Sequence, residues 1–141
     1  MKLQAETLFI VLSVVAALLA IIGGFIVIGS PGEVRMRRLD QQRTIDLVSI
    51  SGAVAGYRLT HDTLPASLED LRRASPNRTI PHKDSTGRAY EYVKRDSFSY
   101  ELCVAFDTAT DQRPSEAQSI FDKHASGRQC FSLEARPRAQ H

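Results

Sequence analysis

The segment from Thr7 to Gly29 contains 23 residues and no charged side chain. An α-helix rises about 1.5 Å per residue, so this segment reaches roughly 35 Å, enough to cross a hydrocarbon core about 30 Å thick. The apolar part of a cleaved signal peptide is shorter, about 7 to 15 residues, and helices buried in soluble proteins normally keep a polar stripe. The segment therefore predicts a retained transmembrane helix over residues 7–29, preceded by a short tail over residues 1–6.

Arginines follow this span closely, and the sequence from Arg35 to Arg43 is polar on nearly every helical face, with no apparent core to bury. The pattern predicts a polar helical stalk over residues 30–46. Arg35, Arg37 and Arg38 are candidate membrane-interface residues, because arginine side chains reach readily to lipid headgroups. Acidic residues are interleaved with these arginines and aromatic residues are absent, which argues against a nucleic-acid partner.

Two features of the sequence disagree on which side of the membrane the domain lies. Arginines after the span favour a cytoplasmic domain under the positive-inside rule. The two cysteines, Cys103 and Cys130, suit a disulfide in an oxidising compartment, although two buried free thiols would also explain them. The residues alone leave both orientations open.

The remainder of the chain predicts one small α+β domain over residues 47–135, followed by a disordered tail over residues 136–141. Leu47, Ile50, Val54 and Tyr57 recur at helical spacing on a helix that Ser30 is expected to cap and that extends to about His61. Gly52 and Gly56 lie near this apolar stripe, where they would let a sheet approach the helix closely.

A short helix capped by Ser67 is predicted next, and strands follow from Ala89 onward. Residues 89–94, 97–106 and 129–133 have the composition or the alternation of half-buried strands, and Phe98 is expected on the buried face. Cys103 and Cys130 fall on the same, solvent-side face of adjacent strands, so a bond between them is geometrically feasible. The predicted architecture is an amphipathic helix packed on a small antiparallel sheet.

This order of elements, together with three motifs, resembles type IV pilin-like proteins and the pseudopilins of type II secretion. The motifs are Tyr57…Leu64-Pro65-x-Ser67-Leu68-x-Asp70-Leu71, Asp84-x-x-Gly87-x-x-Tyr90-x-Tyr92, and Tyr100-Glu101-Leu102-Cys103. The resemblance covers roughly residues 33 to 106. It implies a protein of the bacterial inner membrane with its domain on the periplasmic side, in contact with other envelope proteins.

The chain departs from that family at its N-terminus. Family members carry a glycine before the apolar segment, where a prepilin peptidase cuts, and a glutamate five residues after the cut. Here Glu6 precedes the span and no glycine stands before Thr7. We therefore expect an uncut anchor that stays in the membrane rather than entering a fibre.

No pattern in the sequence predicts catalysis, a cofactor or a metal site. The four histidines, His61, His82, His124 and His141, are far apart, and there is no nucleophile elbow, P-loop or dinucleotide fingerprint. Four aspartates, Asp84, Asp107, Asp111 and Asp122, are expected in loops as solvated charges rather than as cation ligands. The sequence predicts a non-enzymatic structural or interaction protein; the alternative is a membrane-tethered ligand-binding or sensory module.

Overall fold

The computed structural model describes residues 2–28, 30–110 and 119–135. The chain divides into two compact units, Met1–Arg35 and Met36–His141. The predicted tail over residues 136–141, as well as Gly29 and Asp111, lie outside the described residues. Within those residues the chain is α+β: a long apolar N-terminal helix, further helices and a three-stranded antiparallel sheet.

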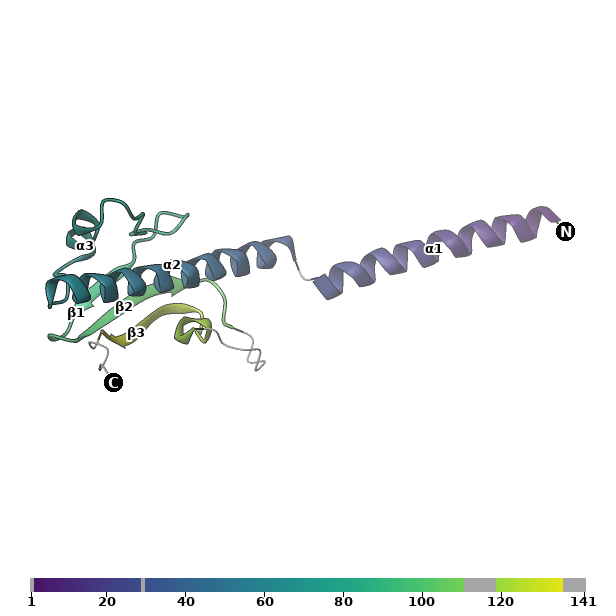
Figure 1. The fold of residues 1–141 in the computed structure, drawn as a ribbon. Coiled ribbons are helices and arrows are strands. Elements are labelled where there is room, and N and C mark those ends of the chain that lie inside the picture. The colour runs from purple at the N-terminus through teal and green to yellow at the C-terminus, as the bar shows by residue number, and fades with distance from the viewer. Residues whose placement is uncertain (1, 29, 111–118, 136–141) are drawn as a thin grey trace, which may run out of the picture. The chain divides into compact units, whose positions relative to one another are not determined.

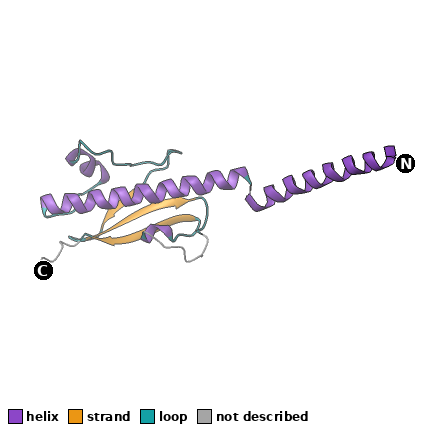
Figure 2. Cartoon of the chain, turned by 45° about the vertical axis from the view of Figure 1, so that its right-hand side comes forward, coloured by secondary structure: helices purple, strands orange, loops and turns teal. Residues whose placement is uncertain are grey.

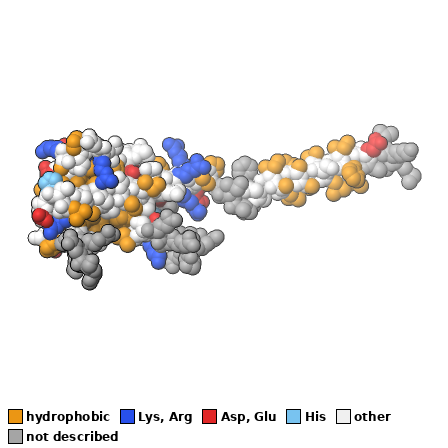
Figure 3. Space-filling model, viewed as in Figure 1, with side chains coloured by type: hydrophobic (Ala, Val, Ile, Leu, Met, Phe, Trp, Pro, Cys, Tyr) orange, Lys and Arg blue, Asp and Glu red, His pale blue; other side chains and the backbone are white. Residues whose placement is uncertain are grey.

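Helix α1 spans Lys2–Ile28 and includes residues 7–28 of the predicted membrane segment (Figure 1). Its stretch Glu6–Gly24 is long and apolar enough to cross a bilayer, and none of it is buried within the structure. Leu8 and Leu19, for example, remain 61% and 64% exposed, and hydrophobic atoms cover much of this helix in Figure 3. The described apolar side chains of this helix are exposed on every side, which matches a lipid environment better than water.

Helix α2 spans Pro31–His61, and Ser30 caps its start. The Ser30 hydroxyl accepts a hydrogen bond from the Glu33 backbone amide at 3.3 Å, as the sequence predicted. Basic side chains gather over the first turns of α2 (Figure 3). The helix then lies along one face of the sheet (Figures 1 and 2).

The short helix α3 spans Leu68–Ala74, and its N-cap is the predicted Ser67, which accepts from the Asp70 amide. The sheet follows in the order β1-β2-β3, formed by Glu91–Lys94, Ser99–Phe106 and Gly127–Glu134. A 3-10 turn, η1, at Ile120–Asp122 precedes β3. The strands pair antiparallel, with Leu102 opposite both Tyr92 and Phe131.

The core lies between α2 and the sheet. Alternate residues of β2 point into it, which confirms the period-2 interpretation of this strand. The buried hydrophobic cluster comprises Leu47, Ile50, Ala53, Val54, Leu64, Leu71, Ile80, Tyr90, Tyr100, Leu102, Val104, Phe106, Phe121 and Ala135. Two tyrosines tie the layers together: the Tyr90 hydroxyl donates to Asp46 at 2.6 Å, and the Tyr92 hydroxyl donates to the Pro65 carbonyl at 3.0 Å.

Two expectations about packing between α2 and the sheet are wrong. Phe98 was expected on the buried face, but β2 begins only at Ser99, and Phe98 is 43% exposed beneath the guanidinium of Arg58. Gly52 and Gly56 do not accommodate the sheet, because a Cβ atom added at either position would meet nothing within 4 Å. Both glycines therefore lie away from the packed side of α2.

Candidate functional site

A buried arginine cluster joins the first part of α2 to two loops of the domain. Its centre is Arg43, which is only 1% exposed, although the sequence pattern predicted no buried side chain in this polar stretch. One terminal nitrogen of the guanidinium, Nη1, donates to Asp40 at 2.6 Å and to Asp107 at 2.8 Å. The Nε atom donates to Asp84 at 2.8 Å, and Nη2 makes an ionic contact with the same oxygen at 2.6 Å.

Asp40 extends the cluster to the segment that leaves β2. Its carboxylate accepts from the backbone amides of Asp107 and Thr108, at 3.0 and 2.7 Å, and from the Thr108 hydroxyl at 2.6 Å. With Arg43 as a further donor, both oxygens of this carboxylate are engaged. One turn of α2 therefore holds the end of β2 through a side chain that is itself 3% exposed.

Asp84 organises the second loop. Its Oδ1 atom accepts from the amides of Thr86 and Arg88, both at 2.9 Å, and from the Thr86 hydroxyl at 2.7 Å. Gly87 completes this turn with φ of 91°, a backbone conformation that residues with a Cβ atom adopt rarely. The other oxygen of Asp84 faces Arg43, so the turn is fixed to the helix by charge.

The electrostatics of the cluster keep its carboxylates ionised. Burial by itself raises the pKa of Asp84, but hydrogen bonds from Thr86 and Arg43 outweigh it and lower the pKa to about 2. For Asp40 the balance is the same: burial raises the pKa, and the bonds from Thr108, Asp107 and Arg43 lower it. The contact with Arg43 also lowers the pKa of Asp107.

This arrangement stabilises the fold and offers little to a substrate. Asp107 uses one oxygen for Arg43 and the other for Arg88, at 2.8 Å each, so each oxygen already has a cationic partner. A carboxylate with a lowered pKa and engaged oxygens is a poor general base near neutral pH. Three aspartates converge here, yet a guanidinium occupies the centre; within the described ranges, no group of His, Cys, Asp and Glu is arranged to hold a metal ion.

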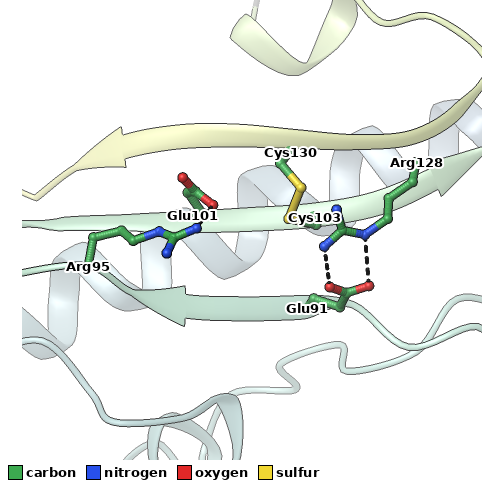
Figure 4. The surroundings of a disulfide bond; sticks show 6 residues. All are labelled: Glu91, Arg95, Glu101, Cys103, Arg128 and Cys130. Atoms are coloured by element: carbon green, nitrogen blue, oxygen red, sulfur yellow. Dashed lines mark hydrogen bonds and ion pairs between the residues drawn. A yellow bond between two sulfur atoms is a disulfide. The ribbon is translucent and has the colours of Figure 1, made fainter.

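The outer face of the sheet carries a second set of connections (Figure 4). Cys103 of β2 and Cys130 of β3 lie directly opposite each other and form a disulfide, which confirms the predicted pair. Glu91 of β1 and Arg128 of β3 form an ion pair at 2.6 Å that crosses β2 beside the disulfide. The two edge strands are thus linked to each other over the central one.

The other residues singled out from the sequence are not brought together. Arg35, Arg37 and Arg38 are exposed, as membrane-interface residues would have to be. Of the histidines, His61 stacks on Tyr57 with ring centroids 4.0 Å apart, and His124 stacks on Phe106 at 3.5 Å. His82 is exposed, and His141 lies outside the described residues.

Sequence reasoning missed the role of Asp84 and Asp107, which it assigned to solvent. Asp84 is 9% exposed, and both aspartates lie in the Arg43 cluster. Asp40 and Arg43 lie three residues apart on one helical face, a spacing that predicts a local ion pair. Their long-range partners leave no periodic signal, because residues 84 and 107 approach α2 only through the tertiary fold.

Comparisons with protein-family models, with characterised proteins and with solved structures find no match for this chain.

Replacing Arg43 with methionine should destabilise the domain strongly. The change leaves Asp40 and Asp84 buried without their counter-charge, and breaking a buried ion pair on one side typically costs about 3 to 5 kcal/mol. Urea unfolding of the detergent-solubilised chain can be followed by tyrosine fluorescence, since the chain has no tryptophan and four tyrosines. The matched control is Arg128→Met, which removes an exposed pair and should cost at most about 1 kcal/mol. Equal losses for the two variants would contradict this account.

The stability contributed by the cluster should depend on pH in the acid range. The folded-state pKa values of Asp40, Asp84 and Asp107 lie below the usual value, so their contribution is present above a pH of about 4 and is lost as the pH falls through the folded values, about 2 for Asp84. The gap in unfolding free energy between the natural chain and Arg43→Met should therefore shrink between pH 5 and pH 2. A gap that stays constant over this range would refute the assignment.

Proposed function

We propose that this chain is a membrane-anchored, pilin-like protein of the bacterial cell envelope that acts through structure and interaction rather than catalysis. The observation that carries the proposal is α1: it is apolar on its exposed sides, none of the stretch Glu6–Gly24 is buried, and α2 starts only three positions after its last residue. A chain built in this way presents its domain at a membrane surface.

The α+β architecture supports the pilin-like part of the proposal. A long helix that supports a small antiparallel sheet over its C-terminal half is the arrangement that the motif order implied. Ser67 as the cap of α3, Asp84 and Gly87 in one turn, and Tyr90 and Tyr92 as ties to the helix side give structural roles to the residues that carried the resemblance.

The chemistry of the domain supports the non-enzymatic part. The buried ionisable side chains of the Arg43 cluster bind one another, and the pKa values of its three carboxylates are lowered rather than poised near neutrality. Active sites commonly show the opposite pattern, in which titratable groups in a cleft are held near their working pH. The cluster is therefore better explained by stability than by catalysis.

Retention in the membrane tests the anchor. After alkaline carbonate extraction, the natural chain should stay in the membrane pellet, and mass spectrometry should find a mature form that still contains Thr7–Gly29. The variant Leu18→Arg, Leu19→Arg should lose retention, because each arginine at the centre of a span costs about 2.5 to 3.5 kcal/mol on insertion. The control Val93→Arg, Ile120→Arg changes two exposed apolar residues of the domain and should be retained. A soluble natural chain, or a mature form beginning near Pro31, would refute the anchor.

Thiol labelling tests the periplasmic side. A membrane-impermeant maleimide applied to intact cells should label the chain only after a reductant has opened the Cys103–Cys130 disulfide. Disulfides persist in the oxidising periplasm and are rare in the cytoplasm. Labelling that requires disruption of the membrane, without any reductant, would place the domain in the cytoplasm and agree with the positive-inside rule.

A further inference from the structure

The side of α2 that faces away from the core carries an exposed apolar seam. Ile45, Val48 and Leu59 are 54%, 45% and 71% exposed. Gly52 and Ala55 lie between them and are also exposed. The positions 45, 48, 52, 55 and 59 alternate steps of three and four residues, which is the spacing of the a and d positions of a coiled coil.

The charged side chains of α2 avoid this seam. Between residues 39 and 60 the helix has four of them: Asp40, Arg43, Asp46 and Arg58. Asp40 and Arg43 are buried in the cluster, Asp46 accepts from Tyr90, and Arg58 lies over the Phe98 ring at 4.8 Å. Each of these charges is therefore turned toward the domain, so the seam is neutral over its whole length.

The two glycines on this side have no intramolecular explanation. A glycine inside a helix costs about 0.5 to 1 kcal/mol relative to alanine, and Gly52 and Gly56 have open space where a side chain would be. Glycines four residues apart allow another helix to approach closely. The open space thus lies where a partner helix would need it, between Val48 and Leu59.

We propose that two copies of this chain pair in the membrane through the seam of α2, side by side, in parallel and in register. The inference rests on the proposed anchoring. If α1 holds every copy in the same bilayer, each α2 begins three positions after an anchored helix, so the N-terminal ends of two neighbouring seams are kept at the same level. Parallel pairing places each seam residue opposite its own equivalent.

A second copy fits this surface because, in a parallel pair, each seam residue faces the same residue of the other copy. Any charge on the seam would then be repelled by its equivalent, and the seam carries none. Ile45 meets Ile45, Val48 meets Val48 and Leu59 meets Leu59, and no like charges oppose each other at the seam positions. Arg38 marks the N-terminal end of the neutral stretch, where lipid headgroups are available to the arginines. The seam spans only about two heptads, which is short for a stable coiled coil in solution. Tethering in a bilayer compensates, because it raises the effective concentration of one copy around the other.

Cysteine cross-linking of the full-length chain tests the pairing. Val48→Cys places a thiol on the seam, and Thr60→Cys places one on an exposed position of the same helix outside it. Both chains are reconstituted at low density in vesicles of phosphatidylcholine and phosphatidylglycerol and treated with a mild oxidant. We expect several-fold more covalent dimer from Val48→Cys, and mass spectrometry should identify the 48–48 linkage. Equal yields from the two chains would overturn the proposal.

A second variant distinguishes specific pairing from cross-links formed by random collision of two copies in the bilayer. Ile45→Glu added to Val48→Cys puts two carboxylates opposite each other in a parallel pair, so the dimer yield should fall to that of Thr60→Cys. Ile45 is exposed, so the melting of the domain should not change. A yield that is insensitive to Ile45→Glu would also overturn the pairing. Alkaline extraction of the same vesicles separates the two ideas: a chain that stays bound but does not cross-link refutes the pairing alone, whereas a chain that is released refutes the anchor.

Discussion

The buried guanidinium of Arg43 is the interaction on which the tertiary arrangement of the domain depends. Three carboxylates from separate parts of the chain meet it, and Asp40 and Asp84 are themselves nearly excluded from water. Carboxylates at this depth are costly unless a cation and hydrogen-bond donors compensate them, and here both are supplied. The cluster thereby joins α2, the turn at Asp84–Gly87 and the end of β2 at one point, beside an apolar core formed by the same elements.

The two sides of helix α2 have different roles. Leu47, Ile50 and Val54 bury their side chains against the sheet, and the Arg43 cluster extends the packed side toward the N-terminus of the helix. The opposite side is neutral and carries the seam proposed as a contact between copies. This separation of charge explains why α2 packs in a defined rotation: between residues 39 and 60 its charged side chains, and not only its apolar ones, face the domain.

The sheet is held from both faces. Hydrophobic side chains of β2 fill the space under α2, and the disulfide with the neighbouring Glu91–Arg128 ion pair connects the three strands on the outer face. The exposed ion pair contributes little by itself, whereas a disulfide typically stabilises a fold by about 2 to 4 kcal/mol. A three-stranded sheet with one covering helix is a small structure, and the disulfide adds to its limited hydrophobic stabilisation.

The sequence by itself determined the elements whose signal is local. Twenty-three uncharged residues predicted the apolar helix, Ser30 and Ser67 predicted the caps, and strict alternation predicted β2 together with the facing cysteines. Only the tertiary structure decided which polar residues are buried and which residues they pair with. Arg43 and Asp84 look like solvated charges in the sequence, because ion pairing between residues far apart in the chain depends on how the loops return to the helix and leaves no periodic pattern. The same holds for Gly52 and Gly56, whose open side became apparent only once the sheet was seen to lie against the other face of α2.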